Sequence, residues 1–520
     1  MGYDKNMIRN EVKKIIKEIV DRDARLERPN NAEFGDYSTN VALRTKIAPE
    51  KIVEKLKSHP IFEKVEVAGP GFINFTLSKK CLLDELVEII KQGVDYGRLT
   101  LGKGKKVQVE FISANPTGPL TVANGRGGPF GDVLSGILAK AGFNIERAYY
   151  VNDYGAQIVA LGHSVLGDEQ AVYKGEYIDK LNEKIKKQNA PETGKWAAEY
   201  IIKNLIRKTT DKLGIKYDEW ILESELHKSG LVDKVRDFLE KKDLIYEQDG
   251  AKWFKSSQFG DNRDRVIVKK DGDKTYLAGD IAFHWHKFNE KKFDKVINIW
   301  GADHHGDVPG LKAGVEAIGH KGKLETVLLQ FVTILEKREK KRMSKRAGVY
   351  VEMDELIDKT GVDAVRFFFL QKSPDTHLNF DMDLAREQSS KNPVYYVQYA
   401  YARICGILRT AKTINMLDIE CLTPDMLDVQ CLTSSDLVLV RQLIKFPEIV
   451  EDTAKDYQVQ RLPQYSMELS NAFHKFYEKC RVLDEGNPGL SQARIGLIKA
   501  TQIVLRNTLN LMGIKAPEKM

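Results

Sequence analysis

The chain has 520 residues, of which 42% are hydrophobic and 30% are charged, and its formal net charge is +7. This length exceeds what one hydrophobic core supports, so we expect two to four domains with the composition of an ordinary globular protein. No run of about 18 apolar residues is present, which argues against a membrane-spanning helix. The mild positive charge suits a polyanionic partner without requiring one.

Neither the N-terminus nor the cysteines indicate an exported protein. The opening residues, MGYDKNMIRNEVKK, are charged and lack the apolar core of a secretory signal. The five cysteines are scattered and form no Cys-x-x-Cys pair, as expected of reduced thiols. We therefore expect a cytoplasmic protein.

Residues 1–103 predict a small α+β domain. An amphipathic helix near the N-terminus carries Val12, Ile16 and Val20 on one side. The segment NAEFGDYSTNVALR that begins at Asn31 is typical of a turn followed by a second helix. The later segment VEVAGPGFINFTL predicts two strands around a Gly-Pro-Gly turn.

Residues 104–384 predict a Rossmann-like domain with a parallel sheet, because strands alternate with helices from Val107 onward. A helix is expected where apolar residues repeat between Phe130 and Ala141. The polar stretch of about 165–290 interrupts this pattern and is interpreted as an insertion. Further buried strands are expected within residues 143–155, 295–306 and 328–335. Residues 385–520 then predict an all-α domain rich in aromatic side chains.

The segment VQVEFISANPTGPLTVAN, residues 107–124, carries the clearest chemical signal. An apolar strand leads through a tight Pro/Gly turn into a helix, whose free N–H groups and dipole favour an anion. Glu110 and Asn115 lie just before the turn and offer acceptors to the same edge. This arrangement favours a nucleotide bound beside a positively charged small molecule.

A basic loop after the last predicted strand points to the same chemistry. Seven of the ten residues at 337–346 are lysine or arginine, and Gly348 follows. A mobile loop that brings a lysine onto a polyphosphate would stabilise the charge that develops as a phosphorus–oxygen bond breaks. A solvated loop is the alternative interpretation. The sequence contains no Walker-A pattern and no GxGxxG after a strand, which disfavours P-loop hydrolysis and dinucleotide redox chemistry.

Two shorter patterns are consistent with a substrate site. Tyr276 and Asp280 are four residues apart, so on a helical turn they would share a face and could clamp a guanidinium or ammonium group. An N-cap and a core tyrosine are the alternative explanation. Asp303 and the two histidines after it could form a metal site, but no further Cys/His pair is nearby, so polar contacts to a sugar or base are favoured.

Long segments of the chain, in the same order, are similar to those of one family. They include EFGDYSTNVA, GPGFINF, SANPTGPL, YYVNDYG, TYLAGDIA, GADHHG, RMSKRAG and NPVYYVQYAYAR. The chain thus resembles arginyl-tRNA synthetase, a class I aminoacyl-tRNA synthetase, over nearly its whole length. The resemblance implies an arginine–tRNA ligase that uses ATP to form arginyl-adenylate and transfers arginine to the terminal adenosine of tRNA(Arg).

The resemblance also implies roles for individual residues of this chain. The residues expected to hold arginine are Glu110, Ser113, Asn115, Tyr276 and Asp280. Catalytic contacts to the phosphates are expected from Thr121, Asn124, Ser344 and Lys345. The remaining ATP contacts are expected from Pro116, Thr117, Gly118, Gly125, Gly301, Asp303, His304 and Met343. The expected tRNA contacts are Phe34, Gly35, Asp36 and Tyr37 in the N-terminal domain and Tyr396, Tyr399 and Met520 in the C-terminal domain.

The sequence departs from the family at one important place. The family's His-x-Gly-His element corresponds here to Thr121-Val122-Ala123-Asn124. Thr121 and Asn124 retain hydroxyl and amide donors, so we expect an active enzyme, with a catalytically inactive tRNA-binding relative as the alternative. A class I ligase for an apolar amino acid is disfavoured, because it would leave Glu110 and Asp280 unpaired. Mg²⁺ is expected with ATP, without a dedicated protein site, and the chain is expected to be a monomer.

Overall fold

The computed structural model describes residues 7–185, 189–337, 339–340, 351–413 and 429–520, and its chain divides into two compact units. Unit 1 comprises residues 1–101, 388–457 and 461–520, and unit 2 comprises residues 102–387 and 458–460. The first 101 residues and nearly all of residues 388–520 thus belong to one unit. Among the described residues, no helix combines the length and the apolar character needed to cross a membrane.

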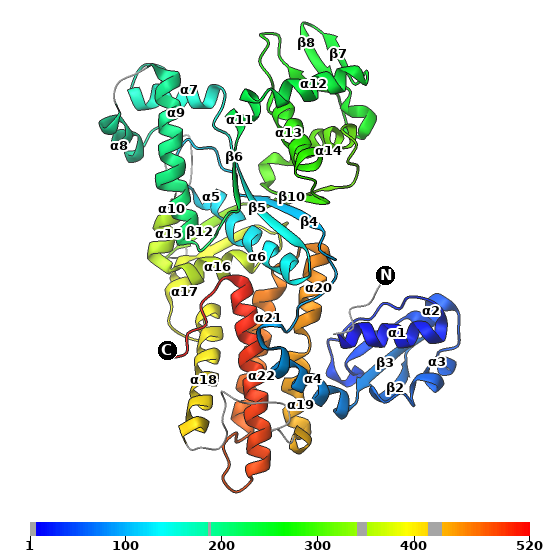
Figure 1. Ribbon diagram of the computed structural model, residues 1–520. Coiled ribbons are helices and arrows are strands. Elements are labelled where there is room, and N and C mark those ends of the chain that lie inside the picture. Colours follow the sequence, from blue (N-terminus) through cyan, green and yellow to red (C-terminus); the bar gives the residue numbers. More distant parts are fainter. Residues whose placement is uncertain (1–6, 186–188, 338, 341–350, 414–428) are drawn as a thin grey trace. The chain divides into compact units, whose positions relative to one another are not determined.

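Unit 2 is built on a five-stranded sheet in the order β11-β10-β4-β5-β6 (Figure 1). Every neighbouring pair in it is parallel, which confirms the predicted parallel sheet. Its strands are β4 (Lys106–Phe111), β5 (Asn144–Val151), β6 (Glu219–Leu222), β10 (Lys295–Gly301) and β11 (Leu324–Leu329). Strand β6 lies within the stretch interpreted from the sequence as one insertion, so the chain returns to the main sheet there.

Two small sheets accompany the main one. One is antiparallel and consists of β7 (Ile245–Gln248), β8 (Ala251–Phe254) and β9 (Arg265–Val268). The other consists of β12 (Val332–Glu336), β13 (Glu339–Lys340) and β14 (Leu378–Asp381). The prediction of a single strand at 328–335 is therefore wrong, because these residues are divided between β11 and β12, which belong to different sheets. The chain turns at Gln330, whose N–H bonds to Pro374 and whose carbonyl accepts from Arg126.

Helices cover both faces of the main sheet. Along each strand, successive side chains point to opposite faces. Phe111 faces α6, where a side chain at Gly131 would collide with its ring. Glu110 therefore faces the opposite side. The helices of unit 2 are α5 (Val122–Gly125), α6 (Gly127–Lys140), α7 (Ala156–Leu166), α8 (Glu176–Lys184), α9 (Ala190–Ile201), α10 (Arg207–Lys212), α11 (Glu223–Lys228), α12 (Leu231–Lys241), α13 (Tyr276–Trp285), α14 (Val308–Ala317), α15 (Met353–Thr360), α16 (Val362–Leu370) and α17 (Met382–Arg386).

Unit 1 combines a small α+β part with a helical bundle. In the α+β part, β2 and β3 pair antiparallel around the predicted Gly-Pro-Gly turn, and β1 pairs with β3. Its elements are α1 (Ile8–Val20), β1 (Tyr37–Thr39), α2 (Val41–Thr45), α3 (Pro49–Leu56), β2 (Phe62–Ala68) and β3 (Phe72–Leu77). The other helices are α4 (Lys79–Gln92), α18 (Pro393–Thr413), α19 (Ser434–Leu443), α20 (Phe446–Asp456), α21 (Arg461–Lys479) and α22 (Pro488–Met512).

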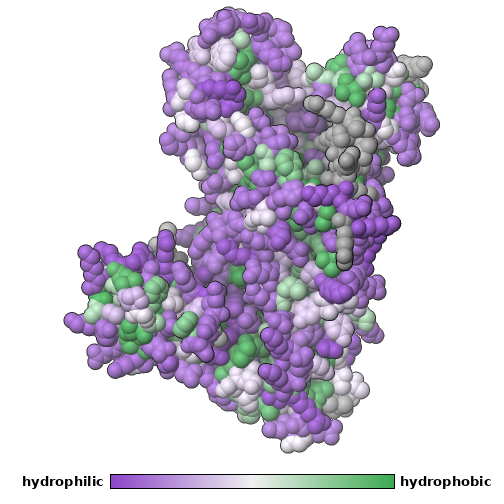
Figure 2. Space-filling view, turned by 180° about the vertical axis from the view of Figure 1, so that it is seen from behind, coloured by the Kyte–Doolittle hydropathy of each residue, from purple (hydrophilic) through white to green (hydrophobic). Residues whose placement is uncertain are grey.

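Local sequence explains the ends of these helices. Helix α4 begins after Ser78, whose hydroxyl accepts from the Cys81 N–H, and α22 begins after Asn487, whose side chain accepts from the Leu490 N–H. Helix α22 ends at Gly513, which has a left-handed conformation with φ of +64°. Hydrophilic residues cover most of the face in Figure 2, and hydrophobic residues form small separate groups on it.

Candidate active site

The carboxyl ends of the five parallel strands bring together residues that are far apart in sequence. Glu110 lies at the end of β4, Glu223 directly follows β6, and Asp303 lies just beyond β10. In an open parallel sheet, ligands bind at this edge. Helix α13 places Asp280 in the same region, since Asp280 interacts electrostatically with both Glu110 and Glu223. Glu110, Glu223 and Asp280 are called the acidic cluster below.

Glu110 is buried and already has partners on both carboxylate oxygens. Its Oε2 accepts from the Lys287 ammonium at 2.5 Å, and its Oε1 accepts from the Ser113 hydroxyl at 3.1 Å. The Tyr150 N–H in turn donates to Ser113 Oγ. The fold therefore already holds in place the Glu110 carboxylate that is predicted to contact a substrate.

The other two acids of the cluster have no such counter-ion. Among the described residues, no lysine or arginine pairs with Asp280 or Glu223, and the ion contact of Glu223 is His227 at 3.8 Å. Oε2 of Glu223 is buried without a hydrogen-bond partner. Burial, together with the negative charges of Glu110 and Glu223, raises the pKa of Asp280 to about 8. The cluster therefore has a deficit of positive charge.

Tyr276 begins α13, one turn before Asp280, so the predicted shared face of a helix is confirmed. Its side chain is 64% exposed, unlike the acids it accompanies. Its pKa is raised by burial of part of the ring and by the nearby charge of Glu223. Tyr276 is thus placed between the acidic cluster and solvent.

The turn after β4 is strained and is held by tyrosines. Ile112 and Ser113 have φ angles of +66° and +41°, which residues other than glycine rarely adopt. The Tyr217 hydroxyl donates to the Phe111 carbonyl, and the Tyr149 hydroxyl donates to that of Ala114. This support leaves Asn115 exposed at the site, with its Oδ1 accepting from Asn152 at 2.9 Å.

The next turn, Pro116 to Gly118, is covered by helix α8. The Tyr177 hydroxyl donates to the Thr117 carbonyl at 2.8 Å. A side chain at Gly118 would lie 3.2 Å from the Tyr177 ring, so glycine permits this close approach. Pro116 is buried, whereas Thr117 and Gly118 are partly exposed.

Thr121 and Asn124 are bonded to each other at the N-terminus of α5. The Thr121 hydroxyl donates to Asn124 Oδ1 at 2.8 Å, so the Asn124 amide keeps its two hydrogens for another acceptor. Thr121 is buried, and its hydroxyl hydrogen is used inside the protein. Of the two expected phosphate donors, Asn124 is therefore the one that the structure leaves available.

Gly125, expected at ATP, is closely packed. A side chain there would collide with Met353, and the Gly125 N–H donates to the Thr121 carbonyl. Its contact with ATP stays a prediction. Met343, Ser344 and Lys345 lie outside the described residues. The segment that follows them is anchored at the site, because the Val122 N–H donates to the Val351 carbonyl.

The residues expected at adenosine follow β10. Asp303 and His304 are exposed on a short 3₁₀ turn, η6 (Ala302–Gly306), and His304 Nδ1 lies 3.3 Å from Asp307. The Asp303 carboxylate lies against Gly301, where it occupies the position that a side chain would take. No group of three His, Cys, Asp or Glu among the described residues is arranged to hold a metal ion.

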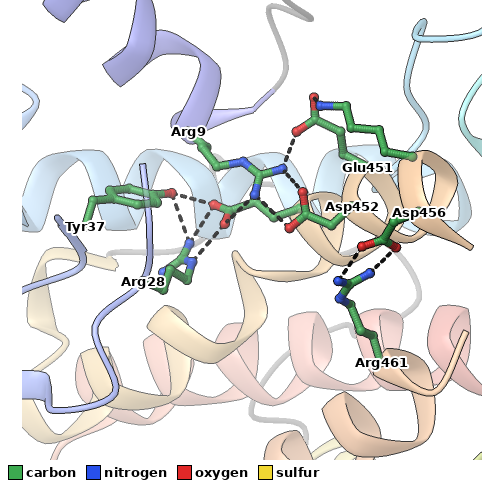
Figure 3. A network of polar contacts seen from close by, with 9 residues as sticks. Arg9, Arg28, Tyr37, Glu451, Asp452, Asp456 and Arg461 are labelled. Atoms are coloured by element: carbon green, nitrogen blue, oxygen red, sulfur yellow. Dashed lines mark hydrogen bonds and ion pairs between the residues drawn. The ribbon is translucent and has the colours of Figure 1, made fainter. Parts of the chain in front are cut away.

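The residues expected to contact tRNA through the N-terminal domain differ in exposure. Phe34 is 52% exposed, whereas Tyr37 is fully buried and donates its hydroxyl hydrogen to Glu448 of α20 (Figure 3). Asp36 is buried as well and accepts from the Leu77 N–H and from Arg441. A side chain at Gly35 would collide with the Phe75 carbonyl. Of these four residues, only Phe34 presents a side chain to a partner.

Around Tyr37, buried charges form a network between the α+β part and the bundle of unit 1. Glu448 accepts from Arg28 at 2.7 and 2.9 Å, and Arg9 forms a bidentate pair with Asp452 and also contacts Glu451 (Figure 3). Burial would raise the pKa of Glu448, but the charge of Arg28 and its hydrogen bond lower it. Every carboxylate in this network therefore has its counter-ion within the protein.

The bundle of unit 1 has a groove of about 980 Å³ between α18, α21 and the end of the chain. Tyr399 and Met520, two of the expected tRNA contacts, line it together with Tyr477. Arg403 stacks on the Tyr399 and Tyr477 rings at 4.9 and 5.3 Å. The other basic side chains that line it are Arg409, Lys479, Arg481 and Lys519. Tyr396 does not line the groove and instead packs 5.0 Å from His474. Aromatic and basic groups on one surface are typical of single-stranded nucleic acid sites.

Two residues of the site were missed in the sequence. Glu223 follows a strand that lay inside the predicted insertion, so no sheet edge was assigned to it. Lys287 lies seven residues after Asp280, two helical turns along the same face, and that spacing is the signal that could have found it.

Three family models match the chain. They are the arginyl tRNA synthetase N terminal domain over residues 5–77, the catalytic domain of class I (R) tRNA synthetases over residues 173–382, and the DALR anticodon binding domain over residues 397–520. The Rossmann-like catalytic unit, the α+β N-terminal part and the helical C-terminal part are thus in agreement with the predicted fold class.

Similar proteins span the same length. A protein of Caldanaerobacter subterraneus named arginine–tRNA ligase is 43% identical and covers 96% of this chain and 94% of its own length. One of Bacillus subtilis with the same name is 41% identical, with 95% and 94% covered. The arginyl-tRNA synthetase structure of Thermus thermophilus has a TM-score of 0.78 at 21% identity and covers 99% of this chain and 100% of its own. The comparisons do not support the alternative of an inactive relative. The chain belongs to the arginyl-tRNA synthetase family.

Proposed function

We propose that this enzyme, an arginine–tRNA ligase, recognises its amino acid through the acidic cluster at the carboxyl edge of the sheet. The observation that carries the proposal is the charge imbalance there: three buried or partly buried acids are served by one built-in cation, Lys287. A guanidinium group would supply the missing charge and form charge-assisted hydrogen bonds to Asp280 and Glu223. Tyr276 would close over it from the solvent side, and Ser113 and Asn115 would face the α-amino end.

The cluster would favour arginine over similar amino acids, because these would leave some of its carboxylate oxygens without charged hydrogen-bond donors. An apolar side chain would leave Asp280 and Glu223 unpaired, and each lost charge-assisted bond costs about 1.5–3 kcal/mol. Lysine brings a charge but no planar fork of donors, so it would satisfy fewer of the carboxylate oxygens at once. Discrimination would therefore rest on hydrogen bonding and not on the size of the site.

We propose that ATP lies along the turn and the helix N-terminus that follow β4. Pro116, Thr117, Gly118, Gly301, Asp303 and His304 would line its adenosine and phosphates, with Asn124 donating to a phosphate oxygen and Thr121 orienting Asn124. Activation joins the arginine carboxylate to the α-phosphorus and releases pyrophosphate, so the enzyme needs alignment and positive charge rather than a nucleophile of its own. Lys345, with Ser344 and Met343 beside it, would supply part of that charge.

Mg²⁺ would arrive with ATP, held by phosphate oxygens and water, and would neutralise the leaving pyrophosphate.

We propose that tRNA(Arg) contacts unit 1 at two places. Phe34 would pack against the outer corner of the tRNA, and the groove lined by Tyr399 and Met520 would take anticodon-loop bases, which stack on aromatic rings and Arg403. Asp36 and Tyr37 would act by holding the Phe34 turn in place. A cytoplasmic location, which the scattered cysteines favour, and a monomeric enzyme remain part of the proposal.

The test is charging of total tRNA with radiolabelled arginine, ATP and Mg²⁺, with lysine and glutamate as parallel substrates. We expect charging with arginine alone. Charging with lysine as well would contradict the proposed fit of a planar guanidinium. Thr121→Val and Asn124→Ala then test the phosphate site: we expect Asn124→Ala to slow adenylation more than Thr121→Val, because only the amide reaches a phosphate. The reverse order would contradict the assignment.

A further inference from the structure

Lys287 is a buried cation that no substrate can reach. Its side chain is 0% exposed, it lies on η5 (His286–Glu290), a π-helical turn that continues α13, and its ammonium packs 4.0 Å from the centre of the Phe283 ring. Burying an ammonium is costly unless it is paired and hydrogen-bonded, so a lysine at this place needs an explanation. Since it cannot touch arginine, any effect on the substrate passes through its neighbours.

The neighbours of Lys287 are linked by a chain of hydrogen bonds. At each link, the group nearer to Lys287 is the donor. The Lys287 ammonium donates to Glu110 Oε2 and lies 3.4 Å from Asn298 Oδ1. Asn298 is the register partner of Glu110 on the adjacent strand β10, so both side chains are on one face of the sheet. The Asn298 amide bonds to His284 Nε2 at 3.1 Å, and His284 Nδ1 bonds to the Asp280 backbone carbonyl at 2.7 Å.

The protonation of His284 follows from this geometry. The Asp280 carbonyl can only accept, so Nδ1 of His284 carries the hydrogen and Nε2 accepts from the Asn298 amide. Burial and the charge of Lys287 lower the pKa of His284 well below its usual value, which keeps the ring neutral. With His284 neutral, the Asn298 oxygen is turned toward Lys287. Each of these buried polar groups is then satisfied.

We propose that Lys287 is a positioning residue that couples two acids of the substrate site, Glu110 on β4 and Asp280 on α13. It fixes the Glu110 carboxylate directly, and through Asn298 and His284 it fixes the backbone of Asp280. Glu110 in turn holds the strained turn at Ile112 and Ser113 through the Ser113 hydroxyl. The coupling holds the acids of the cluster in the positions that bind arginine before arginine arrives. This inference rests on the proposed role of the cluster.

The first test is Lys287→Met, which keeps the length of the side chain and removes its charge. We expect the dissociation constant for arginine, measured by calorimetry on the full chain, to rise at least tenfold, and the KM for ATP in tRNA charging to change less than twofold. The matched control is Arg366→Met. Arg366 is also fully buried in unit 2 and pairs with Asp132, away from the acidic cluster. We expect it to lower the melting temperature without changing arginine affinity.

A double substitution separates positioning from general stability. If Lys287 acts through Glu110, Lys287→Met should weaken arginine binding little further in a chain that already carries Glu110→Gln. Lys287→Arg, which keeps the charge and is the safer variant for folding, should weaken binding by three- to tenfold, because a planar fork replaces a compact ammonium.

The outcomes are distinct. Unchanged arginine affinity in Lys287→Met, or full multiplication of the two effects in the double variant, would overturn the positioning role. A parent enzyme that prefers another amino acid would instead contradict the proposed role of the cluster. Weaker arginine binding with the expected loss of additivity would support the coupling.

Discussion

Two carboxylates in this protein, the buried Glu448 in unit 1 and the partly buried Asp280 in unit 2, have opposite electrostatic surroundings. Glu448 is paired with Arg28 and accepts from Tyr37, and these partners lower its pKa despite burial. Asp280 has two acids nearby and no paired cation among the described residues, and its pKa is raised to about 8. A buried acid with its counter-ion built in is structural, whereas one that lacks it is suited to a cationic ligand.

Glu110 lies between these two cases. It is in the acidic cluster, as a ligand of arginine would be, yet it is paired with Lys287, as a structural acid would be. The comparison therefore distinguishes three roles for the same kind of side chain: holding the fold, binding the substrate, and connecting the two. Position at the sheet edge alone does not distinguish these three roles. The presence or absence of a positively charged partner within the protein distinguishes them.

The largest expected effect concerns the structural acid. Glu448→Gln removes a buried charge and leaves Arg28 without its partner, so we expect a loss of about 3 kcal/mol in the free energy of unfolding, measured with urea. The KM for arginine should not change. Glu485→Gln, an exposed position in the same unit, is the control and should have no measurable effect. An increase in arginine KM without loss of stability would contradict the comparison.

Asp280→Asn is the corresponding change in the proposed arginine site. We expect the KM for arginine to rise between about 10- and 150-fold, because a charge-assisted hydrogen bond contributes about 1.5–3 kcal/mol, while the KM for ATP stays nearly constant. Steady-state charging assays measure both. Asp271→Asn, on the exposed loop before α13, provides the matched control. An unchanged arginine KM would remove Asp280 from the substrate site.

The pH dependence of arginine binding tests the charge deficit itself. With a pKa of about 8, Asp280 carries a proton at neutral pH in the empty enzyme. A bound guanidinium favours the ionised form, so binding releases that proton and affinity increases as pH rises toward 8. We expect up to about tenfold tighter binding per pH unit between pH 6 and 8.

Calorimetry in buffers of different ionisation enthalpy would detect the released proton directly. The Asp280→Asn variant should show a flat profile over the same range. Affinity that falls with rising pH would show that Asp280 is already ionised without its ligand.

The sequence by itself determined the parallel-sheet unit, the strand–turn–helix that begins at β4, the shared face of Tyr276 and Asp280, and the family. These depend on local spacing and apolar periodicity, which act over a few residues.

Tertiary structure decided which predicted residues have free side chains. Tyr37 and Asp36 are buried by partners more than 400 residues away, the Thr121 hydroxyl is used by Asn124, and Gly125 makes room for Met353. It also brought Glu223 and Lys287 to the site, from the end of a strand inside the predicted insertion and from the π-helical turn after α13. The physical reason is that charge balance and burial are set by contacts between distant segments, so a buried acid is assigned to the fold or to a ligand only once its neighbours are known.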